Sequence, residues 1–158
     1  MSELDFKTWF VAERAKALAG MWLTRRDDLE VRATKAEAGL EYVVRIKSDD
    51  HEEHRQFGIV IKATMSVVSI DQANAQLRPT IGQFTSANSS FPVCVFFLMV
   101  KDDKGYFTWE LEPVIREGQP KLQANTRADC RVLNDGSIES IVAQVKSWYA
   151  ALAESFNV

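Results

Sequence analysis

Cysteine, proline and long apolar runs are all scarce in this sequence. Its 158 residues include four prolines and two cysteines, Cys94 and Cys130, which lie far apart and form no CxxC pair. Cys94 falls in a strongly apolar segment, where a buried, reduced thiol is expected. The cysteine pattern therefore predicts a protein of a reducing compartment.

No stretch of the sequence has the length and composition of a membrane span or a secretion signal. The longest apolar run, Val93 to Val100, is too short to cross a bilayer. The first residues, MSELDFK, lack the charged-then-apolar pattern of a signal peptide. We therefore expect a cytoplasmic protein with no membrane partner.

A strong excess of basic charge is also missing. Lysine and arginine number 19 against 22 aspartate and glutamate residues, which gives a net charge of −3 and a pI of about 5.5. This balance argues against strong, indiscriminate binding of nucleic acid. The hydrophobic content of 46% and the length predict one ordered globular domain over residues 1–158.

Hydrophobic periodicity predicts an alternation of helices and strands. A polar segment over 117–130 is expected to be irregular, with a short strand after it at 131–133. The other predictions are helices over 4–23, 66–84 and 138–152, and strands over 29–34, 39–47, 56–65, 91–100 and 106–111. This order is typical of an α/β sandwich with a mixed sheet, in which strands 56–65 and 91–100 lie parallel across a crossover.

Several finer predictions accompany this outline. Asp71 is expected to cap the middle helix, in which Pro79 starts a new piece or makes a kink, and Pro113 is expected to end its strand. Turns are expected at 35–38, 48–55 and 85–90. The residues predicted to face the core are Phe6, Trp9, Phe10, Val11, Ala17 and Met21 in the first helix, Ile70, Ala73, Leu77, Ile81 and Phe84 in the second, and Ile138, Ile141, Val142, Val145, Trp148 and Tyr149 in the third.

Two charged residues interrupt strands that are otherwise apolar. Glu41 lies early in the strand 39–47, and Lys62 lies within 56–65. A charge inside a buried strand is costly unless it is paired or used. A structural ion pair between neighbouring strands is one explanation, and a functional site is the other.

Three segments, in this order, resemble the restriction-endonuclease-like PD-(D/E)XK superfamily. They are GLEYVV (39–44), FGIVIKA (57–63) and FPVCVFFLMVKDDKGYFTWELEP (91–113). The chain looks most like a small bacterial family of that superfamily associated with phage-defence loci, over most of its length from Phe6. The resemblance implies a core of helix, three strands, helix and strand, here extended by a return strand and a C-terminal helix.

The resemblance also implies an activity, namely hydrolysis of DNA or RNA phosphodiesters with Mg²⁺ or Mn²⁺ in bacterial or phage conflict. Glu41 corresponds to the first metal ligand and Lys62 to the catalytic lysine, while Glu13 corresponds to an auxiliary carboxylate that some members supply from the first helix. In such sites the metal lowers the pKa of the attacking water, and the lysine stabilises charge at the phosphate. A homodimer and a protein partner in a defence system are further expectations.

The sequence departs from this pattern at two positions. Glu41 stands where aspartate is usual, and Val60 stands where an acid or glutamine is usual; a valine side chain does not coordinate metal. A catalytically inactive member that binds protein or nucleic acid is therefore the alternative hypothesis. An unrelated mixed α/β domain, which would lack the parallel crossover, is a third.

Other conspicuous residues are explained without a site. The segment His51–His54 is too polar for a buried metal centre and is expected to form a solvated turn. The basic residues Lys35, Arg45, Lys47, Arg55 and Lys62 are expected to be scattered rather than to form one patch. The aromatic residues Trp9, Phe96, Phe97, Trp109 and Trp148 are expected to fill the core rather than to stack on bases.

Overall fold

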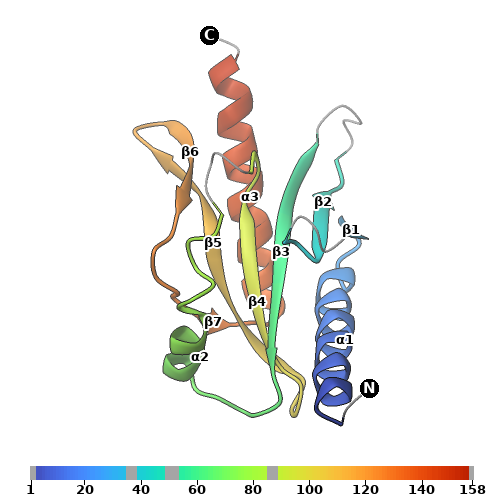
Figure 1. Cartoon of the computed structure of the whole chain (residues 1–158). Helices are drawn as coiled ribbons and strands as arrows, with labels where there is room; N and C mark the ends of the chain where they lie inside the picture. Colours follow the sequence, from blue (N-terminus) through green and yellow to red (C-terminus); the bar gives the residue numbers. More distant parts are fainter. Residues whose placement is uncertain (1–2, 35–38, 49–53, 85–88, 157–158) are drawn as a thin grey trace.

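The computed structural model describes residues 3–34, 39–48, 54–84 and 89–156. These residues form one mixed β-sheet with three helices packed against it (Figure 1). The predicted mixed α/β class is confirmed. The elements are α1 (Glu3–Thr24), β1 (Leu29–Ala33), β2 (Tyr42–Ile46), β3 (Arg55–Thr64), α2 (Ile70–Leu77), β4 (Val93–Met99), β5 (Lys104–Arg116), β6 (Gln119–Ala124), β7 (Arg131–Val132) and α3 (Asp135–Phe156).

The sheet has the strand order β1-β2-β3-β4-β5-β6, and β7 pairs with β5. Strands β3 and β4 are parallel, and the other pairings among the described strands are antiparallel. The chain crosses from β3 to β4 through α2, so the predicted parallel crossover is confirmed. The element order through β4 also agrees with the predicted helix, three strands, helix and strand.

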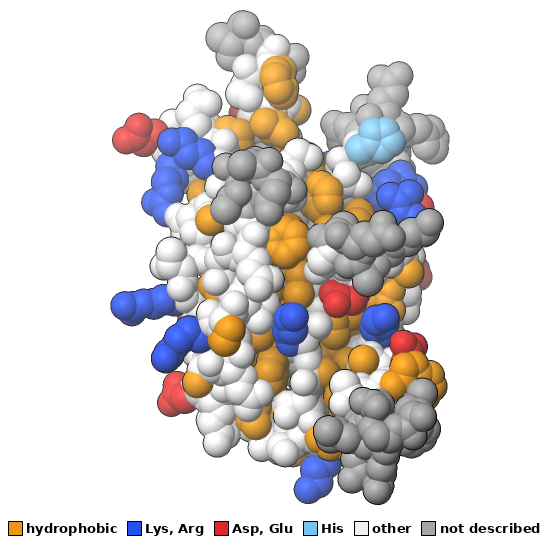
Figure 2. Space-filling model, in the orientation of Figure 1, with side chains coloured by type: hydrophobic (Ala, Val, Ile, Leu, Met, Phe, Trp, Pro, Cys, Tyr) orange, Lys and Arg blue, Asp and Glu red, His pale blue; other side chains and the backbone are white. Residues whose placement is uncertain are grey.

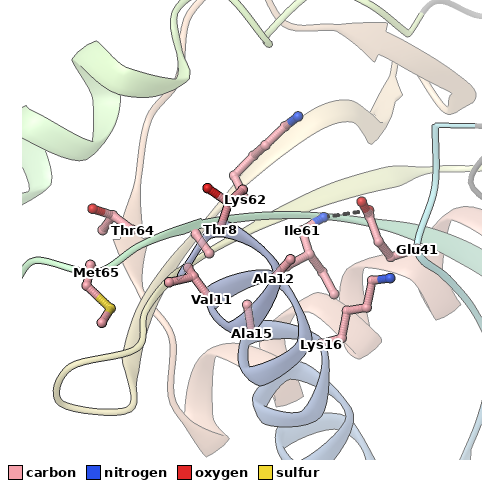
Figure 3. Close-up of a pocket in the computed structure, with 11 residues that line it drawn as sticks. Thr8, Val11, Ala12, Ala15, Lys16, Glu41, Ile61, Lys62, Thr64 and Met65 are labelled. Atoms are coloured by element: carbon pink, nitrogen blue, oxygen red, sulfur yellow. Dashed lines mark hydrogen bonds between the residues drawn. The ribbon is translucent and has the colours of Figure 1, made fainter. Parts of the chain in front are cut away.

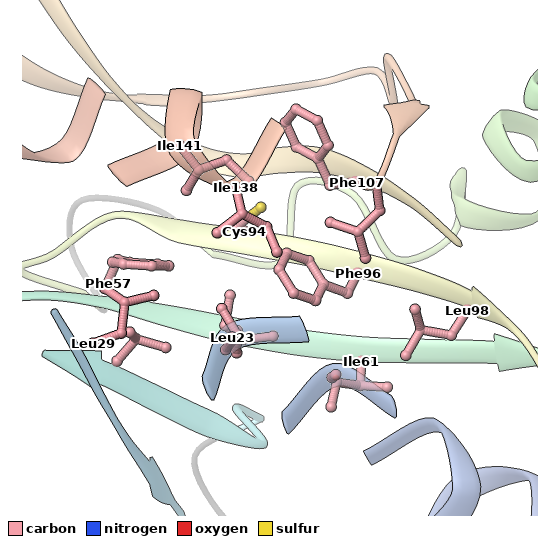
Figure 4. Packing of buried hydrophobic residues seen from close by; sticks show 14 of the residues in the cluster. Leu23, Leu29, Phe57, Ile61, Cys94, Phe96, Leu98, Phe107, Ile138 and Ile141 are labelled. Carbon is pink, nitrogen blue, oxygen red and sulfur yellow. The ribbon is translucent and has the colours of Figure 1, made fainter. Parts of the chain in front are cut away.

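Strand β4 is buried along its whole length because both faces of the sheet are covered. On one face, Cys94 and Phe96 pack in a cluster with residues of α1 and α3 (Figure 4). On the other face, Val95 and Phe97 pack with residues of α2. The apolar run 93–99 therefore forms a central strand, as predicted. Both cysteines are buried and free.

The predicted core face of α1 is wrong at four of its six positions, whereas Val11 packs partly buried against the core as predicted. Ala15 and Ala19 are fully buried instead of those four residues. The small alanine side chains let the helix backbone approach the sheet closely, which turns the bulky residues on the neighbouring face toward solvent. The residues predicted to be buried and found exposed are Trp9 (55%), Phe10 (43%), Met21 (45%) and Ala17.

Helix α2 has a different cap from the predicted one and ends sooner. Its N-cap is Ser69, whose hydroxyl accepts from the Gln72 amide while the Gln72 side chain accepts from the Ser69 amide. Asp71 lies in the first turn, where its charge favours the positive end of the helix dipole. The helix stops at Leu77, two residues before Pro79, so the predicted continuation across the proline is wrong. Ile70, predicted to face the core, is 37% exposed.

The hairpin β5–β6 replaces the predicted strand end at Pro113 and the first part of the predicted irregular segment, whereas residues 125–130 are irregular as predicted. Glu117 and Gly118 both have positive φ angles, 52° and 78°, and they connect the strands as a two-residue turn. The Glu110 carbonyl faces β6, and the main-chain groups of successive strand residues point to alternate sides. The Pro113 nitrogen therefore points away from β6, and the β5–β6 ladder loses no hydrogen bond at the proline. On that other side, β4 pairs only as far as Leu111.

The final helix follows the prediction closely. The Asn134 side chain accepts from the Ser137 amide at 2.8 Å, and this N-cap starts α3. The apolar stripe from Ile138 to Trp148 is buried, and Tyr149 is half-buried. No helix within the described ranges is long and apolar enough to cross a bilayer.

Some predictions lie outside the described residues. They concern the turn 35–38 with Lys35, most of the turn 48–55 with His51, Glu52 and Glu53, the loop positions 85–88 and the side chain of Phe6.

Candidate functional site

A cavity of about 440 Å³ lies between α1 and the second half of β3 (Figure 3). Helix α1 contributes a single stripe of residues, because positions 8, 11, 12, 15 and 16 repeat with the helical period. The other side comes from the end of β3, from Glu41, which precedes β2, and from Met65. The lining residues are Thr8, Val11, Ala12, Ala15, Lys16, Glu41, Ile61, Lys62, Ala63, Thr64 and Met65.

The cavity exists because β3 has partner strands of unequal length. Its ladder with β2 ends at the Tyr42–Ile59 pair, whereas its ladder with β4 continues to the Thr64–Met99 pair. From Ile61 onward, β3 therefore has a neighbour among the described strands on one side only. The open side faces the cavity.

Glu41 lies where the β2–β3 ladder ends and the β3–β4 ladder continues. Its amide donates to the Ile59 carbonyl at 2.9 Å, and its carboxylate Oε2 accepts the Ile61 amide at 2.8 Å. The carboxylate thus takes the place that the main-chain carbonyl of Leu40 would occupy opposite Ile61 if the β2–β3 ladder continued in the same register. Burial raises the pKa of the Glu41 carboxyl, and the Ile61 amide and the nearby Lys62 and Lys16 ammonium groups oppose this increase.

Two lysines flank Glu41 from opposite faces of the sheet. Lys62 extends on the face that α2 covers, and Lys16 comes from α1 on the other face (Figure 3). The Tyr42 hydroxyl donates to the Lys16 carbonyl at 2.9 Å, which ties α1 to the start of β2. Lys16 was not singled out from the sequence, although its position three residues after Glu13 on one helix was a usable signal.

The ion pair considered for Glu41 and Lys62 does not form. Within the described part of the chain, the Lys62 ammonium makes no hydrogen bond or ion pair, and its side chain is exposed. Its charge nevertheless acts on the Glu41 carboxyl and favours the ionised form. Lys62 is therefore available to a ligand.

Glu13 and Val60 lie outside the cavity lining. The Glu13 side chain is 51% exposed and pairs with Lys16 at 3.9 Å. Val60 is 4% exposed and packs in the α2-side core with Leu40 and Val95. The structure thus brings together Glu41 and Lys62 of the predicted site, whereas Glu13 is not among the residues that line the cavity.

The described residues do not fit a two-metal centre. Among the described residues of the cavity lining, Glu41 supplies the one carboxylate, and the other charged residues are Lys16 and Lys62. Nowhere in the described ranges do three or more His, Cys, Asp or Glu residues form a group that could hold a metal ion. Two ammonium groups beside a single carboxylate favour an anionic ligand over a divalent cation.

Glu110, in β5, is the charged residue that the sequence reasoning missed. It is fully buried, and its Oε1 accepts from the amides of Gly82 (2.6 Å) and Phe84 (3.2 Å). Its Oε2 is buried without a hydrogen-bond partner. Burial raises the pKa of Glu110, whereas these amides and the more distant Lys62 lower it. A charge between Trp109 and Leu111 met the same criterion that singled out Glu41 and Lys62.

The described basic side chains do not gather into one patch. Figure 2 shows lysine and arginine side chains spread over the face that it presents. Arg45 is paired with Glu30 at 2.6 Å, across the β1–β2 ladder. This arrangement agrees with the predicted scattering for the basic residues that the structure describes.

Comparisons of the chain with family models, with curated proteins and with solved structures find no match.

Proposed function

We propose that the chain is a nuclease-like domain without a working metal centre, and that the cavity beside Glu41 and Lys62 binds a macromolecular ligand. The observation that carries this proposal is the set of charges among the described lining residues, one carboxylate between two lysines. It corresponds to the inactive alternative that Val60 suggested in the sequence.

The chemistry of phosphodiester hydrolysis supports this choice. A metal centre needs several oxygen ligands to hold the ion and to lower the pKa of the attacking water. The position two residues before Lys62 is a valine buried in the core. Nuclease activity with Mg²⁺ or Mn²⁺ therefore stays a prediction of the resemblance, and binding is the function that we favour.

The decisive experiment is a calorimetric titration of the protein and of Glu41→Ala with Mn²⁺, together with nuclease assays on single- and double-stranded DNA and on RNA. We expect no heat of binding that depends on Glu41 and no cleavage with either Mg²⁺ or Mn²⁺.

One result would overturn the proposal. If Mn²⁺ binds the wild-type protein but not Glu41→Ala, and if Lys62→Ala removes a metal-dependent cleavage, the site is catalytic. Lys101→Ala, in the exposed turn before β5, is the matched control for the loss of one lysine.

A further inference from the structure

The open half of β3 presents main-chain hydrogen-bonding groups to the cavity. The amides of successive residues in a strand point to alternate sides. Gly58 donates to Pro92 and Thr64 accepts from Val100, so even-numbered residues face the β4 side. The Ile59 carbonyl and the Ile61 amide face the opposite side, where they meet Glu41. The carbonyl of Ile61 and both main-chain groups of Ala63 therefore face the open side.

Those groups repeat at the spacing of a β-strand. An added strand forms hydrogen bonds to every second residue of its neighbour, at 3.2–3.4 Å of rise per residue. The phosphates and bases of a nucleic acid do not present alternating donors and acceptors at that interval. A polypeptide main chain does, and strand addition to an exposed sheet edge is a recurrent mode of peptide recognition.

The opposite wall of the cavity suits the side chains of such a segment. Val11, Ala12 and Ala15 form an apolar stripe on α1, and the two alanines leave room beside the strand edge. Met65, which continues the apolar lining past β3, is 51% exposed. Every second side chain of an added strand would point toward this stripe.

The charges at the cavity select among peptides. Lys62 has no partner among the residues described, and Lys16 is 47% exposed beside Glu13. Glu41, the acidic group among the described lining residues, already accepts the Ile61 amide. The two ammonium groups therefore favour a segment that carries an acidic side chain.

We propose that the ligand of this cavity is an extended segment of a partner protein, apolar with an acidic residue, which adds as a strand to β3 at residues 61–64. This inference rests on the proposed function, because it names the ligand of the same cavity. The segment would place its apolar side chains against α1 and its acidic side chain beside Lys62 or Lys16.

The test starts from a phage-displayed library of random linear peptides, selected on the full chain. The strongest peptide is then synthesised with one main-chain nitrogen methylated at a time. We expect affinity to fall roughly tenfold at alternate positions only, since a methylated nitrogen no longer donates to β3. A peptide held by its side chains alone would not show this two-residue period.

Substitutions in α1 locate the peptide. Ala12→Leu fills the cavity from a helical position and should remove binding, whereas Ala17→Leu, on an exposed part of α1 away from the cavity, should leave it unchanged. Ala63→Pro removes an amide that faces away from β4, and it should weaken binding without loss of the β3–β4 ladder.

Four outcomes would overturn the inference. They are failure to select any peptide, binding that Ala12→Leu leaves intact, methylation losses without the two-residue period, and cavity binding by an oligonucleotide or by a second copy of the chain instead. In the last case Ala12→Leu would release the oligonucleotide or make a dimer monomeric in sedimentation, and the proposed function would stand. Metal-dependent cleavage lost in Lys62→Ala would refute the proposed function itself.

Discussion

Glu41 and Glu110 lie in or beside the same sheet and have the same side chain, yet their surroundings differ. Each carboxylate accepts main-chain amides, and burial raises the pKa of each while Lys62 lowers it. Glu110 is fully buried and holds the loop that follows α2, whereas Glu41 is half-buried and lines a cavity. Access to the cavity, rather than the hydrogen bonds to the backbone, separates a candidate ligand-binding residue from a structural one.

The two glutamates also bind different parts of the main chain. Glu110 joins β5 to Gly82 and Phe84 across 28 and 26 residues of sequence, so it fixes a loop that has no ladder of its own. Gly82 has a φ of 98°, which suits glycine at this close approach. Glu41 instead ends the β2–β3 ladder and leaves the next residues of β3 open.

The largest loss of stability is expected from Glu110→Ala. The substitution leaves two buried amides without an acceptor and removes a buried side chain, so we expect the free energy of unfolding to fall by about 3 kcal/mol. Urea denaturation measures it. Glu110→Gln, which keeps one carbonyl oxygen for the amides, should lose less. A loss below about 1 kcal/mol in Glu110→Ala would show that the loop does not depend on this carboxylate.

Glu41→Ala should cost about 1 kcal/mol, because the Ile61 amide that it releases can bond to water in the cavity. The same urea series provides the measurement, with Glu13→Ala, at an exposed position, as the control. A cost equal to that of Glu110→Ala would remove the contrast between the two residues. The affinity for the selected peptide, in contrast, should change in Glu41→Ala and stay the same in Glu110→Gln.

Stability should depend on pH in the same direction for both residues. Each carboxyl has a folded-state pKa above its ordinary value, so the folded state holds the proton more tightly than the unfolded state. Their stabilising contribution is then fully present below the ordinary glutamate pKa of about 4.3. It is lost as the pH rises through the raised folded-state value.

Unfolding measured over this pH range in the wild type and in the two glutamine variants separates the contributions. Each glutamine variant should remove part of the change of the free energy of unfolding with pH. The part removed should be smaller than the free energy lost in Glu41→Ala, because hydrogen bonds and Lys62 offset much of the effect of burial on the carboxyl pKa. A wild-type stability that rose with pH, with the rise removed in the glutamine variants, would contradict the expected direction.

The smallest effect on stability is expected from Lys62→Ala. Its ammonium has no partner in the described chain, so the free energy of unfolding should change by less than about 0.5 kcal/mol at neutral pH. The variant should nevertheless raise both carboxyl pKa values further, which NMR titration of the glutamate side chains would detect. A large loss of stability would indicate that Lys62 is structural.

Several parts of the fold follow from local sequence patterns. The period of α3 and the apolar run of β4 predicted both elements and their buried residues, because a stripe or a run of that kind has few other ways to leave water. The β3–α2–β4 crossover followed from their order. The same reasoning missed β6, because β6 is a mostly polar edge strand. Few of its residues are buried, so its sequence lacks the alternation of apolar and polar residues that predicts a strand.

The candidate site was predictable only in part. Glu41 and Lys62 stood out as charges within apolar strands, and Val60 as a residue unable to bind metal. Lys16 reaches the site because α1 packs against the start of β2, and Glu110 is buried because a distant loop closes over it. Neither contact is encoded within a few residues of sequence.

The sequence by itself determined the mixed α/β class, the crossover and the central strand, because hydrophobic periodicity acts over a single element. Tertiary structure decided which face of α1 is buried, where the β2–β3 ladder stops and which charges meet at the cavity. These depend on how closely helices approach the sheet and on where neighbouring strands end, which only packing between distant segments sets.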